Sequence, residues 1–121
     1  MKRLRVVVVD VGVPPVEGKV DLRAVALGKV VGRTCVIMEQ VFPWRNFPQL
    51  SVVSDAEAPD RDAPANRYLG ESGAWIHGRF LVVAVANGRE RDLTDEEASF
   101  AFSRFAGEAR HGLPAPAGRE G

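Results

Sequence analysis

The sequence predicts an α+β fold: a mostly antiparallel sheet of four to six strands with one C-terminal helix packed on one face. Three observations predict it. Strand-like segments fill most of the chain, short turn signals separate them, and the one strongly helical segment comes last. The strand–helix–strand alternation that builds a parallel sheet is not visible, so short antiparallel connections are expected.

The first predicted strand, residues 3–12, contains four consecutive valines at positions 6–9. Valine is β-branched and favours strands, and an uninterrupted apolar run indicates a strand buried on both faces at the centre of a sheet. The prolines and glycines that follow, up to residue 18, predict a loop. We expect residues 19–42 to form a long β-hairpin that turns at residues 31 and 32.

Prolines and acidic residues predict loops in the middle of the chain. Residues 43–48 are bracketed by two prolines and predict a rigid, partly exposed loop, and residues 50–53 predict a short strand. Residues 54–67 are polar, acidic and without helical periodicity, which predicts a flexible loop. The glycine-rich residues 68–73 predict another loop.

One long strand and a tight turn complete the predicted sheet. Residues 75–86 form the strand, and we expect its alternation to place Trp75, His77 and Arg79 on the face opposite Ile76 and Phe80. Asn87 and Gly88 both tolerate positive φ, so they predict a hairpin turn. A short return strand is expected at residues 89–93.

The C-terminal helix carries the strongest local signal. Thr94 and Glu97 have the spacing of a capping box, in which each side chain accepts a hydrogen bond from the other residue's backbone N–H. His111 and Gly112 predict the helix end. The apolar stripe expected to cover the sheet consists of Ala98, Ala101, Phe102, Phe105 and Ala109, with Phe100 on the opposite, exposed side. A single domain is therefore expected over residues 1–112, with a disordered tail at 113–121.

Charge and cysteine content exclude several classes of protein. Sixteen basic and sixteen acidic residues give a formal net charge of zero, which does not draw the whole chain to nucleic acid or anionic lipid. Cys35 is the only cysteine, so an internal disulfide is excluded and a reducing compartment is favoured. Neither a signal peptide nor an apolar span is visible, and we expect a cytoplasmic protein with no membrane partner.

Asp10 is the first catalytic candidate, because many folds keep a carboxylate at the end of a central strand. With the paired strands expected after it, this beginning resembles that of the ribonuclease H-like and DnaQ-like metal-dependent nucleases, over about the first 42 residues. The resemblance implies several carboxylates around Mg²⁺, for which Glu39 is the second candidate. Val11 and Gly12 follow Asp10, so the second acid of the exonuclease Asp-x-Glu motif is missing.

His77 is the third catalytic candidate, as a lone general base. A nucleophile and an orienting acid do not accompany it at a diagnostic spacing. Two histidines and one cysteine also make a poor zinc site. The sequence therefore favours binding over catalysis and implies no cofactor and no metal.

Aromatic and arginine residues form the predicted binding surface. Trp44, Arg45 and Phe47 share one loop. Trp75, His77 and Arg79 share the sheet face that the helix is expected to leave open. Tryptophan and arginine are enriched in protein interfaces, and the same pairing of aromatics with guanidinium groups binds single-stranded nucleic acid.

Three functions remain open from the sequence. The first is a small non-catalytic binding or assembly domain that binds itself or another protein through the open sheet face. The second is a single-stranded nucleic-acid-binding protein that uses Trp44, Arg45, Trp75 and Arg79. The third is a Mg²⁺-dependent phosphodiesterase that uses Asp10 and Glu39. Zero net charge favours the first of these.

Overall fold

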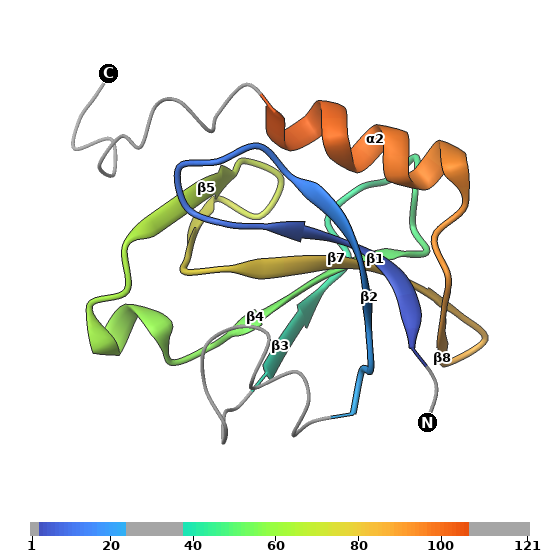
Figure 1. Cartoon of the computed structure of the whole chain (residues 1–121). Helices are drawn as coiled ribbons and strands as arrows, with labels where there is room; N and C mark the ends of the chain where they lie inside the picture. Colours follow the sequence, from blue (N-terminus) through green and yellow to red (C-terminus); the bar gives the residue numbers. More distant parts are fainter. Residues whose placement is uncertain (1–2, 24–37, 107–121) are drawn as a thin grey trace.

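The computed structural model describes residues 3–23 and 38–106 of the chain. Within them the strands are β1 (Leu4–Val9), β2 (Val16–Val20), β3 (Met38–Val41), β4 (Leu50–Asp55), β5 (Ala65–Leu69), β6 (Ala74–His77), β7 (Phe80–Ala86) and β8 (Arg89–Arg91). A short 3₁₀-helix η1 (Ala58–Arg61) precedes β5, and the helix α2 (Asp95–Ala106) comes last. The predicted α+β class is confirmed (Figure 1).

The main sheet has six strands, all paired antiparallel. Its order is β2-β1-β7-β4-β3, and β8 pairs with the second half of β7. The valine-rich β1 lies inside the sheet between β2 and β7, as its apolar run predicts. Strands β5 and β6 form a separate two-stranded sheet.

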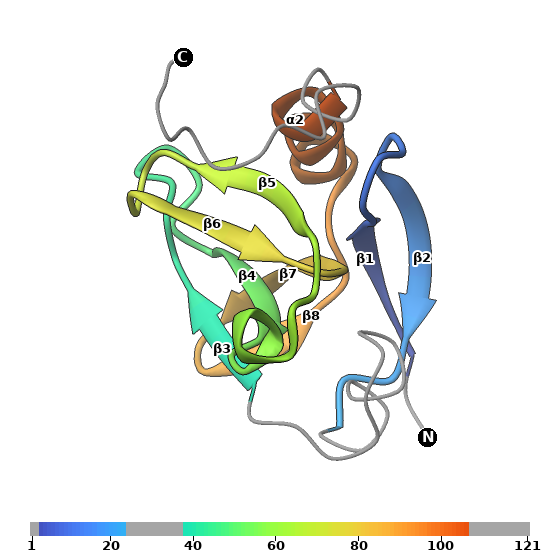
Figure 2. The ribbon, with the colours of Figure 1, turned by 90° about the vertical axis from the view of Figure 1, so that its left-hand side faces the viewer.

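The helix α2 covers one face of the main sheet, together with the β5–β6 hairpin (Figure 2). Ala98, Ala101 and Phe105 of the predicted stripe are buried against Phe80 and other apolar residues of the sheet. Phe102 is half-buried at the same core. This apolar core excludes water, and such burial is the main driving force for folding.

The sheet face turned away from α2 is not the open surface that the sequence predicts. It carries a second cluster of buried residues, namely Val6, Val20, Val53, Leu81 and Val83. Leu81 and Val83, which alternate with the helix-facing side chains of β7, have no exposed surface. Strand β7 is therefore buried on both faces.

The expected hairpin over residues 19–42 is wrong in its described parts. Its ends lie in β2 and β3, which occupy opposite edges of the sheet. Strand β2 begins at Val16, inside the predicted loop, because it pairs with β1 from Leu4↔Val20 to Val8↔Val16. The predicted turn and Cys35 fall within residues 24–37 and lie outside the described residues.

The predicted strand over residues 75–86 is also wrong as a single element. Gly78 has φ +73°, which lies outside the strand region, and it divides the segment into β6 and β7. The segment predicted as loops over residues 54–73 contains η1 and β5. Pairing with β6 stabilises β5 despite the prolines and acids around it.

Two local predictions are confirmed. Asn87 and Gly88 both have positive φ, at 54° and 76°, and connect β7 to β8 as a hairpin turn. In the capping box, the Glu97 N–H donates to Thr94 Oγ1 at 3.1 Å, and the Thr94 N–H donates to Glu97 Oε1 at 2.9 Å. His111 and the predicted tail lie outside the described residues.

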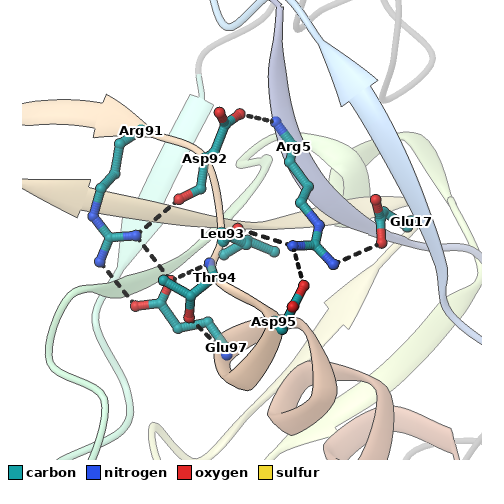
Figure 3. A network of polar contacts seen from close by, with 8 residues as sticks. All are labelled: Arg5, Glu17, Arg91, Asp92, Leu93, Thr94, Asp95 and Glu97. Carbon is teal, nitrogen blue, oxygen red and sulfur yellow. Dashed lines mark hydrogen bonds and ion pairs between the residues drawn. The ribbon is translucent and has the colours of Figure 1, made fainter.

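A polar network holds the start of α2 against β1 (Figure 3). The Arg5 guanidinium on β1 donates to Glu17 on β2, to Asp95 on α2 and to the Leu93 carbonyl between β8 and α2. Asp92 accepts the Arg5 backbone N–H at 2.6 Å. The network thereby fixes the position from which α2 crosses the sheet.

Candidate functional site

Two hollows flank the turn of the β5–β6 hairpin, residues 70–73. The first, here called the β6 groove, has a volume of about 290 Å³ and is lined by Val41, Val52, Ser54, Asp55, Ala56, Pro59, Leu69, Ser72, Ala74, Trp75, Ile76 and His77. The second, here called the Trp44 pocket, has a volume of about 320 Å³ and is lined by Pro43, Trp44, Arg45, Asn46, Glu71 and Phe100. Most of the predicted binding residues therefore gather around one hairpin.

The β6 groove runs along the edge of β6. All four residues of that strand line it, and the facing wall comes from β3, β4 and the turn into η1. Figure 2 shows β6 between β5 on one side and the β3–β4 pair on the other. The groove thus lies between the small sheet and the edge of the main sheet.

On the outer side of β6, a hydrogen bond holds His77 and a ring contact holds Trp75. The carbonyl of Ala63 lies 2.9 Å from His77 Nδ1. A carbonyl only accepts, so the Nδ1–H of His77 is the donor in this contact. Trp75 packs against Tyr68 across the hairpin, with ring centroids 5.4 Å apart at 55°. Its buried indole Nε1 has no hydrogen-bond partner in the described residues.

Trp44 is a core residue, which corrects the expectation of a partly exposed aromatic. It is 6% exposed, and its Nε1 donates to Glu71 Oε2 at 2.7 Å. Its ring meets Phe100 and Phe105 edge-on, at centroid distances of 5.3 and 6.0 Å. Phe47 stacks on Phe100 at 4.5 Å. The expectation that Phe100 lies exposed is therefore wrong as well.

The Trp44 pocket is polar on one side. Burial by itself would raise the pKa of Glu71, but hydrogen bonds from Arg104 and Trp44 outweigh it and lower that pKa below its usual value. Arg104 pairs with Glu71 at 3.1 Å. The exposed Arg45 lies at the rim.

Asp10 forms an ion pair with Arg79, at 2.8 Å, and both side chains are about two-fifths exposed. Burial would raise the pKa of Asp10, and the Arg79 guanidinium with the Val11 N–H lowers it below its ordinary value. Arg79 thus pairs with Asp10, directly after β1, and Gly78 separates it in sequence from Trp75 and His77 on β6.

Asp10 directly follows β1, and Glu39 lies on β3. The strand order places β7 and β4 between β1 and β3, so their backbones lie three strand spacings apart, about 14 Å. Across the described residues, His, Cys, Asp and Glu form no group of three that could hold a metal ion. The geometry offers no shared metal site for this pair.

Sequence reasoning missed Tyr68, Asn66 and Arg67 on β5. Arg67 is fully buried, and its guanidinium donates to the carbonyls of Phe105 and Val13 and to Asn66 Oδ1. The β-favouring Tyr68 was the available signal for this strand. The inward direction of Arg67 follows from tertiary contacts alone.

Among the residues that the structure describes, α2 is too short and too polar to cross a membrane. Comparisons of this chain with family models, with curated proteins and with solved structures found no match.

Proposed function

We propose that this protein is a small non-catalytic assembly domain that self-associates through the outer face of the β5–β6 hairpin. Tyr68 and Trp75 form that face. The alternating residues Leu69 and Ile76 turn inward to the core. The contact between the two exposed-side aromatic rings is the observation that carries the proposal.

The physical character of this face suits a protein partner. Tyr68 is 38% exposed, although it is large and partly apolar, and it lies directly against the half-buried Trp75. A two-stranded sheet is marginally stable by itself, and packing of its second face would stabilise it. Tyrosine and tryptophan are enriched among the residues that dominate interface energies. Two copies related by a two-fold axis would bring these faces together.

Nucleic acid is a less suitable partner for the same residues. The formal net charge of the chain is zero, whereas binding to single strands needs a basic groove. Trp44 is buried, and the Arg79 guanidinium is paired with Asp10. The four residues expected to bind a single strand are therefore divided among separate environments.

Light scattering at micromolar concentration tests the proposal. We expect a dimer whose dissociation constant rises about tenfold or more in Tyr68→Ala and Trp75→Ala, the loss typical of an interface hot spot. Val16→Ala is the matched control, because Val16 is an exposed apolar residue on β2, away from the hairpin.

A monomer throughout the micromolar range overturns the proposal, and so does equal weakening by the Val16 control. Fluorescence anisotropy with a labelled single-stranded oligonucleotide is run on the same samples. Binding that weakens steeply with added salt would favour the nucleic-acid function instead.

A further inference from the structure

We infer that the edge of β6 binds an extended segment of a partner protein chain by strand addition, with side chains of the segment in the β6 groove. This inference goes beyond self-association, because it uses the strand edge and the groove, whose lining shares Trp75 with the outer aromatic face. It rests on two observations: among the described strands β6 pairs with β5 alone, and the deeper residues of the groove are apolar.

Strands β6 and β7 form one bent path, with Gly78 at the bend. In its first half, β7 pairs with β1 on one side and with β4 on the other. On the other side of the bend, β6 pairs with β5, whereas β7 pairs with β1. Asn66 on β5 links this strand to the end of β1 and to the bend, since its Nδ2 donates to the carbonyls of both Val9 and Gly78, at 3.0 and 2.8 Å.

No described strand takes the place of β4 beside β6. The last β4–β7 pair joins Val53 to Leu81, and β4 ends at Asp55, from which the chain turns into η1. In the described part of the chain, β6 pairs with β5 alone. The β6 groove occupies the side that β4 leaves. An unpaired strand edge presents N–H and C=O groups, and an extended peptide can pair with them.

The groove walls indicate which segment fits. Val41, Val52, Leu69 and Ile76 make the deeper wall apolar, and all except Val41 are buried. An extended segment turns alternate side chains to opposite sides. Aliphatic side chains at every second position would therefore enter the groove, over a length of about 13 Å that matches the four residues of β6.

Other occupants fit less well. The lining contains neither lysine nor arginine, so a phosphate or another anion would meet no cation there. A compact small molecule could fill the hollow but would leave the ladder edge of β6 unpaired.

Selection from random peptides displayed on phage tests this inference with the full chain as target. We expect enrichment of peptides with aliphatic residues at alternate positions. Ala74→Phe fills the groove from an exposed position on β6 and is expected to weaken binding of the selected peptides about tenfold or more. The matched control is Ala106→Phe, at an exposed alanine of α2.

Single N-methylation along a selected peptide tests strand pairing without altering the protein. We expect losses of about tenfold at every second amide, those that donate to β6, and little change at the amides between them. No enrichment, equal binding by Ala74→Phe and wild type, or N-methyl effects without alternation overturns the inference. Light scattering reports self-association separately, so failure of one proposal is distinguishable from failure of the other.

Discussion

At the scale of single residues, Glu97 fixes the start of α2 through several polar contacts. Its side chain is buried at the first turn of α2, where it accepts hydrogen bonds from Arg91, from Gln49 and from the Thr94 N–H. The Arg91 guanidinium is the largest cause of a pKa lowered to about 2, with the Thr94 and Gln49 hydrogen bonds adding to it against the effect of burial. Glu97 joins the helix start to β8 and to the segment before β4.

Glu97→Gln is expected to lower the free energy of unfolding at pH 7 by about 3 kcal/mol, the equivalent of the pKa shift. The folded-state pKa lies below the unfolded value of 4.5, so the carboxylate stabilises the fold above pH 4.5 and loses this effect as the pH falls toward 2. Urea unfolding at several pH values measures it. The difference between wild type and variant should shrink across that range.

Glu96→Gln is the control, because Glu96 is exposed on the same turn. It removes one negative charge from the same helix end without touching the Arg91 contact. A difference between wild type and Glu97→Gln that stays constant from pH 7 to about pH 3 would contradict the role given to this carboxylate.

At the scale of elements, the bend at Gly78 creates the candidate site. It turns β6 out of the main sheet and lets β5 pair with it, which opens the groove beside β4. The Gly78 N–H donates to the Pro64 carbonyl at 2.8 Å, so the bend is also tied to the start of β5. A straight strand over the same residues would keep β6 in the ladder of the main sheet.

Gly78→Ala is expected to destabilise the fold by about 1–2 kcal/mol, because φ +73° strains a residue with a Cβ. Space does not limit it, since the added Cβ would lie 3.7 Å from Ala63 Cβ. Gly70→Ala, at a glycine without positive φ, is the control and should cost much less. Urea unfolding of both variants measures the difference, and equal stabilities would refute the strain at the bend.

At the scale of the whole molecule, Arg67 joins three parts of the fold. From β5 it binds the Phe105 carbonyl in the last turn of α2 and the Val13 carbonyl in the β1–β2 loop. The first of these carbonyls lies at the negative end of the helix dipole, which favours a guanidinium there. Arg67 and Asn66 thus connect the hairpin that carries the site to both the helix and the main sheet.

Arg67→Met is expected to lower the free energy of unfolding by about 3–5 kcal/mol, because the buried Phe105 carbonyl and Asn66 Oδ1, and the part-buried Val13 carbonyl, lose this charged donor. Thermal and urea unfolding measure this loss. Arg89→Met, at an exposed residue of β8, is the control and should change stability by less than about 0.5 kcal/mol. If Arg67→Met matched that control, the buried guanidinium would have no connecting role.

The features that depend on a few neighbouring residues could be predicted from the sequence. The valine run of β1, the Asn87–Gly88 turn and the capping box at Thr94 each depend on intrinsic conformational preference or on contacts within four residues. The sequence identified the aromatic candidates by residue type, but it did not predict where the fold places them. Trp44 is buried and contacts Phe100 edge-on, and the ring of Trp75 packs against that of Tyr68.

The sequence by itself determined the α+β class, the central strand and the capped helix, because local hydrogen bonding and hydrophobic periodicity specify them. Only the tertiary structure decided which strands pair, where the last long strand bends, and that Arg67 turns inward. The register of β2 against β1, and the opening beside β6, arise from contacts between residues far apart in the chain. Such contacts balance burial and hydrogen bonding over the whole molecule, and local sequence patterns carry no record of that balance.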